Sequence, residues 1–248
     1  RALPELIQHA HLTHGMDVWV QTNAIRFCKP RYVQELLDAG LTQIFVSYHS
    51  HDAAISDAMT RAPNTHVRTV EGIETALGMG VPVQLNCVVE RQNVFQLGDH
   101  ARQIVERFVR PFPDNPVELV CYSHPCSYFE RADWLKALVP LDEQKPHLLD
   151  AIQVLTAAGV TVEGIGTCGF PPCLFKDQPE LQRTLIRSDY SEANTSGRIY
   201  GDACQKCALI DSCLGVRSEY LEVYGERGLD PFTSPVSEVP NAPDGDSA

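Results

Sequence analysis

Residues 37–49 read Leu-Asp-Ala-Gly-Leu-Thr-Gln-Ile-Phe-Val-Ser-Tyr-His, and this stretch decides the fold. It begins with the end of a helix that Pro30 opens at its first turn and that Gly40 stops. Apolar residues then predict a strand over 44–49 that ends in polar side chains. A helix that passes through a glycine into a short apolar strand is one step of an alternating α/β chain.

The same alternation extends in both directions from this stretch. Helical periodicity predicts helices over 3–14, 30–39, 65–78, 93–109 and 141–158. Short apolar runs predict strands over 17–21, 44–49, 81–89, 117–121 and 160–165. Strands separated by helices indicate βα units and a parallel sheet. We therefore expect an α/β fold for residues 1–165.

Polar residues end three successive strands of this expected sheet. Ligands bind at the carboxyl ends of parallel strands, so these residues predict a polar mouth. Each one alone is equally explained as a helix cap or a turn residue. The residues are Asn23, Ser47, His49 and Asn86.

Composition excludes several classes of protein. The 248 residues carry a formal net charge of -12, which argues against nucleic acid as a partner. No apolar run approaches the roughly 18 residues of a membrane span. Nine cysteines without a secretion signal predict reduced thiols and a cytoplasmic protein.

Five of the nine cysteines fall in a turn-rich segment after the last expected strand. A Cys-x-x-Cys pair, a third cysteine shortly after it and an upstream fourth are a set that zinc or an iron–sulfur cluster would accept. Only one of the two upstream cysteines is needed, and the spacing does not choose between them or between the metals. The predicted ligands are Cys168, Cys173, Cys204, Cys207 and Cys213.

We also make predictions for the remaining cysteines and for the end of the chain. Cys28, Cys87 and Cys121 lie in or beside apolar elements and are expected to be buried small hydrophobes, whereas Cys126 stays undecided. Residues 166–229 are expected to form the cysteine-rich domain, and the proline-rich residues 230–248 a disordered tail.

The order of these motifs resembles the later part of a radical S-adenosylmethionine (radical SAM) enzyme barrel. The matching text runs from Val-Trp-Val-Gln-Thr-Asn-Ala at 18–24 through residues 37–49 to Val-Pro-Val-Gln-Leu-Asn-Cys-Val-Val at 81–89. The spacing Cys204-x2-Cys207-x5-Cys213 resembles the auxiliary-cluster extensions, of SPASM or twitch type, that follow many such barrels. The resemblance implies a partial (β/α)6 TIM-like barrel followed by a small domain that binds an auxiliary 4Fe-4S cluster.

The resemblance also implies roles for the strand-end residues. Ser47 and Asn86 would hydrogen-bond S-adenosylmethionine, with Asn23 near them, and His49 would contact substrate or move a proton. An intact enzyme of this family generates a 5′-deoxyadenosyl radical that removes hydrogen from its substrate. The implied partners are a small-molecule or peptide substrate and an electron donor such as ferredoxin or flavodoxin.

The sequence departs from the family pattern in three ways. The Cys-x3-Cys-x2-Cys motif that holds the S-adenosylmethionine-cleaving cluster is absent, so we expect an N-terminally truncated barrel that is inactive alone. Ala24 replaces a usual glycine, and Arg217 stands where a full SPASM domain has another cysteine. Two alternatives remain open: a non-enzymatic zinc-binding α/β module, and a degenerate barrel that acts as a binding protein.

Overall fold

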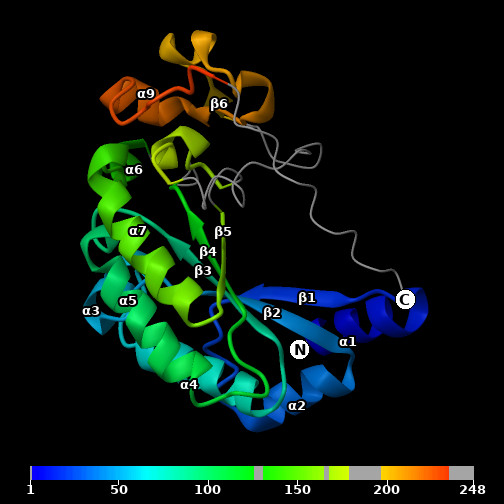
Figure 1. Ribbon diagram of the computed structural model, residues 1–248. Coiled ribbons are helices and arrows are strands. Elements are labelled where there is room, and N and C mark those ends of the chain that lie inside the picture. The colour runs from blue at the N-terminus through cyan, green and yellow to red at the C-terminus, as the bar shows by residue number, and fades with distance from the viewer. Residues whose placement is uncertain (1, 126–130, 165–167, 179–196, 235–248) are drawn as a thin grey trace. The chain divides into compact units, whose positions relative to one another are not determined.

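The computed structural model describes residues 2–125, 131–164, 168–178 and 197–234 (Figure 1). The chain forms two compact units. The first comprises Arg1–Val139 and Gln144–Gly164, and the second comprises Pro140–Glu143 and Ile165–Ala248.

A five-stranded sheet is the centre of the first unit. Its strands follow one another in the order β1-β2-β3-β4-β5, and all neighbouring pairs are parallel. This order is that of consecutive βα units, so the α/β prediction with parallel strands is confirmed. The strands are β1 (Val18–Thr22), β2 (Leu41–Ser47), β3 (Val83–Val88), β4 (Leu119–Ser123) and β5 (Thr161–Glu163).

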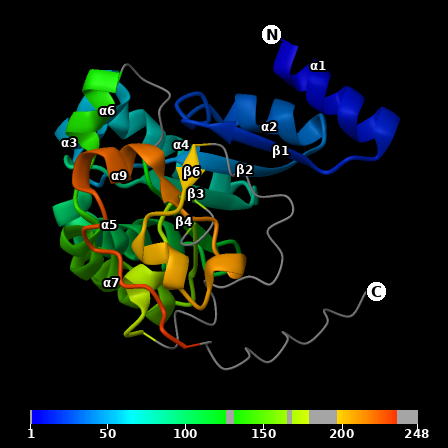
Figure 2. The same cartoon turned by 90° about the horizontal axis from the view of Figure 1, so that it is seen from above.

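Helices connect these strands. The segment before β1 consists of α1 (Ala2–Gln8) and the π-helical turn η1 (His9–Thr13). The connecting helices are α2 (Pro30–Asp38), α3 (Ala53–Thr60), α4 (His66–Gly78), η2 (Val94–Gln96), α5 (Leu97–Ile104), η3 (Val105–Val109), α6 (Arg131–Ala137) and α7 (Leu141–Ala157). Seen from above, α2, α4, α5 and α7 follow one another around the outside of the sheet (Figure 2).

The core of the first unit lies between the sheet and these helices. Val46, Leu85 and Val120 stand on neighbouring strands, and each is at most 1% exposed. Leu36 of α2 and Ile73 of α4 are fully buried, as the helical spacing of their apolar faces predicts. Burial of this shared apolar layer fixes which face of each strand turns away from the helices.

For the first unit, the sequence predicted the five strands of the sheet, but it misplaced some boundaries and missed two α-helices. β2 begins at Leu41 rather than residue 44 because Leu41 pairs with Val18 of β1. Helix α3 was not predicted, although Asp52 caps it by accepting hydrogen bonds from the backbone N–H groups of Ala54 and Ile55. The other missed helix is α6 (Arg131–Ala137).

The second unit contains short elements that a few buried aromatic residues hold together. The hydroxyl of Tyr220, which is fully buried, accepts a hydrogen bond from the N–H of Leu141 and donates one to the carbonyl of Arg227. The elements are η4 (Pro172–Phe175), β6 (Arg198–Ile199), η5 (Ala203–Lys206), η6 (Ile210–Ser212), β7 (Val216–Arg217) and α9 (Ser218–Tyr224), with β6 and β7 antiparallel.

The expected disordered tail begins too early. Phe232 is 6% exposed, and its carbonyl accepts a hydrogen bond from the N–H of Ala208, so this part of the chain packs in the second unit. Burial of the Phe232 ring stabilises an ordered chain here, although the proline-rich sequence around it predicts disorder. Residues 235–248 of the expected tail lie outside the described residues. Across the described part of the chain, no helix has the length and apolar character needed to cross a bilayer.

Candidate functional site

The carboxyl edge of the first unit's sheet brings two predicted site residues together. Ser47 and Asn86 are direct partners in the register of β2 and β3, and Asn86 in turn pairs with Cys121 of β4. Partners in a parallel register point to the same face, and this face is opposite to that of buried Val46. The polar mouth therefore includes a row of adjacent side chains across neighbouring strands.

Asn86 is held in a defined orientation within this row. The hydroxyl of Ser123, the last residue of β4, donates a hydrogen bond of 2.6 Å to Asn86 Oδ1. The side-chain amide of Asn86 therefore has its NH₂ group left to offer to a ligand acceptor. Ser123 was not among the site residues predicted from the sequence. Its position at the end of a fourth strand is the signal that would have identified it.

Asn23 lies directly after β1 and combines a turn with an exposed side chain. Its Oδ1 accepts a hydrogen bond from the N–H of Ile25 at 3.2 Å, which forms an Asx turn. Its carbonyl accepts a hydrogen bond from Thr69 Oγ1 of α4 at 3.0 Å. The turn and the contact with α4 fix the direction in which the chain leaves the strand.

His49 is tied to the neighbouring strand through its ring. Its Nδ1 accepts a hydrogen bond of 3.2 Å from the N–H of Val88, so the neutral ring carries its proton on Nε2. Burial lowers the pKa of His49 to about 4. At neutral pH this side chain is a hydrogen-bond donor through Nε2 rather than an acid.

Asn93 joins the ends of β2 and β3 through its side chain, a role that was not predicted from the sequence. It is 2% exposed. Its Nδ2 donates to the carbonyl oxygens of His49 at 2.7 Å and of Val88 at 2.8 Å, while its Oδ1 accepts from the N–H of Glu90. All of its side-chain polar atoms are therefore used to hold the mouth together.

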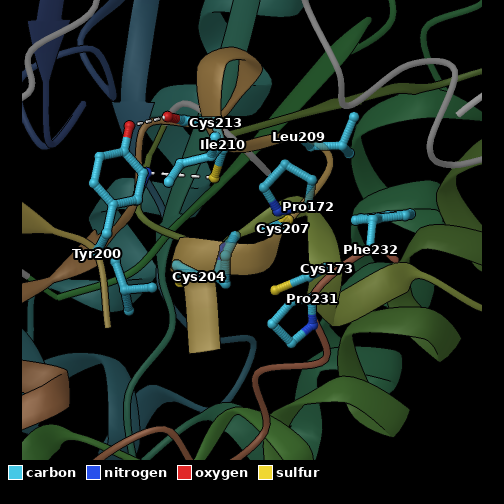
Figure 3. Close-up of a pocket in the computed structure, with 13 residues that line it drawn as sticks. Pro172, Cys173, Tyr200, Cys204, Cys207, Leu209, Ile210, Cys213, Pro231 and Phe232 are labelled. Carbon is cyan, nitrogen blue, oxygen red and sulfur yellow. Dashed lines mark hydrogen bonds between the residues drawn. The ribbon is translucent and has the colours of Figure 1, made fainter. Parts of the chain in front are cut away.

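In the second unit, four of the five predicted ligands line one cavity (Figure 3). They come from two segments of the chain about thirty residues apart, joined here by the fold of η4, η5 and η6. Apolar residues such as Leu209 and Phe232 complete the walls. The four are Cys173, Cys204, Cys207 and Cys213. Cys168, the alternative upstream cysteine, does not line the cavity.

Backbone N–H groups point at several of these sulfur atoms. The N–H of Gly215 donates to Cys213 Sγ at 3.3 Å. Similar backbone contacts favour the thiolate form of two others, Cys204 through Gly201 and Cys173 through Asp230. Such N–H groups stabilise negative charge on sulfur, as thiolate ligands of a metal require.

Burial works in the opposite direction on the same thiols. It is the largest cause of the raised pKa values of Cys204 and Cys213, and it raises the pKa of Cys173 to about 12. Without a cation these side chains stay protonated at neutral pH. A bound metal would supply the charge that burial makes costly and would release the protons.

Four thiols around one cavity form the donor set that a structural zinc ion or a four-iron cluster takes. As they stand, the described histidine, cysteine and acidic side chains form no group of three or more that closes around a single metal ion. By chemistry and number, the four thiols that line the cavity nevertheless fit such a group.

The other cysteines differ in their surroundings. Cys87 is fully buried and Cys121 is 8% exposed, which confirms their prediction as small hydrophobes. Cys28 is only half-buried, and its thiol donates to the carbonyl of Ile25 at 3.1 Å, because it lies in the loop after β1 rather than in the core. Cys126 lies outside the described residues.

Known proteins are similar to part of this chain. No protein-family model matches it. Over 97 residues, 39% of this chain and 25% of the relative, it is 30% identical to the PqqA peptide cyclase of Bradyrhizobium diazoefficiens. Over 94 residues, 38% of this chain and 29% of the relative, it is 36% identical to a probable GTP 3′,8-cyclase of Sulfolobus acidocaldarius. Over these segments the chain is similar to radical SAM enzymes.

The matched segments make up between a quarter and a third of these radical SAM proteins. A solved domain of a pyruvate-formate lyase-activating enzyme from Bacteroides vulgatus is also similar, with 16% identity and a TM-score of 0.49. That similarity covers 64% of this chain and 87% of the solved domain.

Proposed function

We propose that the second unit binds an auxiliary 4Fe-4S cluster through Cys173, Cys204, Cys207 and Cys213. The observation that supports this proposal is the single cavity that these four cysteines line. Four thiolates would complete the coordination of the cluster, which favours electron transfer or support of the fold over direct binding of substrate. The chain contributes the thiols, the backbone N–H groups that stabilise their charge, and the apolar walls that exclude water.

In the first unit, the proposed role of the carboxyl edge is to bind S-adenosylmethionine. Asn86, oriented by Ser123, would donate from its NH₂ group to an oxygen of the ribose or of the methionyl carboxylate. The Ser47 hydroxyl is next to it in register, and the exposed Asn23 side chain follows the adjacent strand. Together they would orient the cofactor.

His49 would act on substrate as a hydrogen-bond donor through Nε2, because its Nδ1 is occupied and its pKa is low. When bound together, S-adenosylmethionine and the family's cleaving cluster supply a 5′-deoxyadenosyl radical that takes hydrogen from the substrate. The Cys-x3-Cys-x2-Cys motif for that cluster is not in this sequence, so we expect no cleavage by this chain alone.

The relative that acts on the PqqA peptide favours a peptide as substrate over a small molecule. A ferredoxin or flavodoxin in the cytoplasm would supply electrons. These assignments concern the whole enzyme to which the present residues would contribute.

Anaerobic purification followed by metal analysis tests the cluster. We expect a brown protein with iron and sulfide bound to the chain, and an electron paramagnetic resonance signal after reduction. A colourless protein with stoichiometric zinc that does not exchange for iron would overturn the cluster proposal. That outcome would support the zinc-binding module, since the same four thiols suit zinc.

A further inference from the structure

An exposed basic cluster lies on the first unit of this acidic protein. Arg26 and Lys29 are in the loop between β1 and α2, and Arg68 is in the first turn of α4. All three side chains are exposed, while the whole chain carries a net charge of -12. We call these three residues the basic rim.

Two contacts join the loop to α4. Arg68 Nη2 lies 3.5 Å from the carbonyl oxygen of Ile25, and Thr69 beside it is hydrogen-bonded to the carbonyl of Asn23. The guanidinium carbon of Arg26 lies 4.0 Å from the centre of the Tyr32 ring, a cation–π distance. These contacts orient the side chains of Arg26 and Arg68.

The rim has no direct ion-pair partner within the described residues, whereas the nearby Arg31 pairs with Glu35 at 3.3 Å. The N-terminus of α2 also adjoins the rim, because Lys29 is its N-cap residue, and its dipole adds partial positive charge there. The N-terminus of α4 adds none, since the Asp57 carboxylate accepts hydrogen bonds from the N–H groups of Thr65 and His66.

The position of the rim favours recognition. The loop that carries Arg26 and Lys29 follows Asn23 at the carboxyl edge of the parallel sheet, where ligands of this fold class bind. A group bound at the rim would lie beside the polar mouth. Exposed charges at such an edge steer and hold an oppositely charged partner.

We propose that the basic rim binds the carboxylates of an acidic peptide segment. The three cations stand on two separate elements along an open surface, which suits several carboxylates spaced along a chain better than one phosphate. The net charge of -12 on the chain opposes binding of a nucleic acid, which carries a phosphate at every nucleotide. The proposal concerns the substrate or partner class and requires neither a bound cluster nor S-adenosylmethionine.

Fluorescence anisotropy on the full chain tests the proposal. The probe is a fluorescein-labelled peptide of alternating glutamate and glycine, with a glutamine–glycine peptide as its uncharged match. We expect the variant R26Q/K29Q/R68Q to bind the acidic peptide about tenfold more weakly, and added salt to weaken binding by the unsubstituted chain. R31Q is the matched control and should change affinity by less than about twofold, because Arg31 already has a partner.

Two further variants separate charge from folding. R26K/R68K keeps the charge and should retain most of the affinity, and K29Q/R68Q leaves the Arg26–Tyr32 contact intact. Thermal unfolding of each variant verifies its fold. Binding of the acidic peptide by R26Q/K29Q/R68Q as tightly as by the unsubstituted chain would overturn the proposal. Binding of the glutamine peptide as tightly as the acidic peptide would also overturn it. So would competition by inorganic phosphate at the peptide's own concentration, or tighter binding of a single-stranded oligonucleotide. The anisotropy measurement does not depend on bound metal. It therefore tests the peptide proposal independently of the cluster proposal.

Discussion

A methyl group added to Gly72 of α4 would lie 2.1 Å from the carbonyl oxygen of Ala24. Ala24 is fully buried and has a left-handed backbone, with φ of 56°. Its carbonyl also accepts a hydrogen bond from the N–H of Phe27, which closes the turn after β1. The helix can therefore approach this turn only where it has no side chain.

We predict that Gly72→Ala destabilises the protein by about 3 kcal/mol, because the backbone of α4 or of the turn must move. Gly78→Ala is the matched control in the same helix. Its added Cβ would meet only Phe112 at 3.7 Å, an ordinary contact, and it should be neutral or stabilise by about 0.5–1 kcal/mol. Urea unfolding measures both. Equal stability of the two variants would contradict the close approach.

We predict that stability of the first unit falls as the pH is lowered. Burial lowers the pKa of His100 to about 3 and that of His49 to about 4, and it also lowers the pKa of His66. Each binds a proton in the unfolded chain near pH 6.5 more readily than in the fold, so the stabilisation present above about pH 6.5 is lost on acidification, by about 1 kcal/mol per pH unit for each of His49 and His100.

Urea unfolding between about pH 8 and about pH 5 measures this slope. His100→Leu should flatten it, because that side chain is 2% exposed and packs against Tyr48 with ring centres 4.9 Å apart. Exposed His14 offers the control His14→Gln, which should leave the slope unchanged. A slope that His100→Leu does not alter would assign the pH dependence to other groups.

We predict that Cys173 and Cys168 differ in their effect on bound metal. Cys173→Ser removes a thiol from the cavity, so iron per chain should fall well below that of the unsubstituted protein after anaerobic reconstitution. Cys168→Ser should retain iron and the visible spectrum. The reverse result would make Cys168 the ligand and would require the segment around it to rearrange on metal binding.

We predict that Gly215→Ala shortens the time for which a reconstituted metal centre survives in the presence of a chelator. Gly215 has φ of 78°, its added Cβ would lie 2.7 Å from the carbonyl oxygen of Ile199, and its N–H serves Cys213. Gly197→Ala is the control, since Gly197 has a similar φ of 70° but open space around it. At both positions alanine in a left-handed backbone conformation costs about 1 kcal/mol of stability, and only Gly215→Ala adds the clash. Equal lifetimes would show that the clash does not reach the sulfur.

The parallel sheet and the long helices were predictable because their apolar periodicity is strong and local. Helix α7 over Leu141–Ala157 and helix α2 over Pro30–Asp38 match their predicted ranges to within a residue. The π-helical turns η1 and η3 were not predictable, since they continue the helical pattern of residues without changing it.

The types of residue in the candidate site were predictable from the sequence. Which of the candidate residues come together, and in which orientation, was not. The sequence offered Cys168 and Cys173 equally, and only the fold of η4 brings Cys173 to the cavity. Likewise, Asn86 was named from its strand end, while its orientation depends on Ser123, thirty-seven residues later. Such choices depend on contacts between distant segments, which periodicity does not encode.

The left-handed turn at Ala24 has a consequence for how this protein can vary. The turn determines where Asn23 presents its amide and where Arg26 and Lys29 project. A larger residue at position 24 would disturb both surfaces at once, because the position is fully buried and its conformation disfavours bulky side chains. Exchange of the exposed side chains on an unchanged loop can instead alter ligand preference. The buried turn at Ala24 therefore lets specificity change while the fold stays the same.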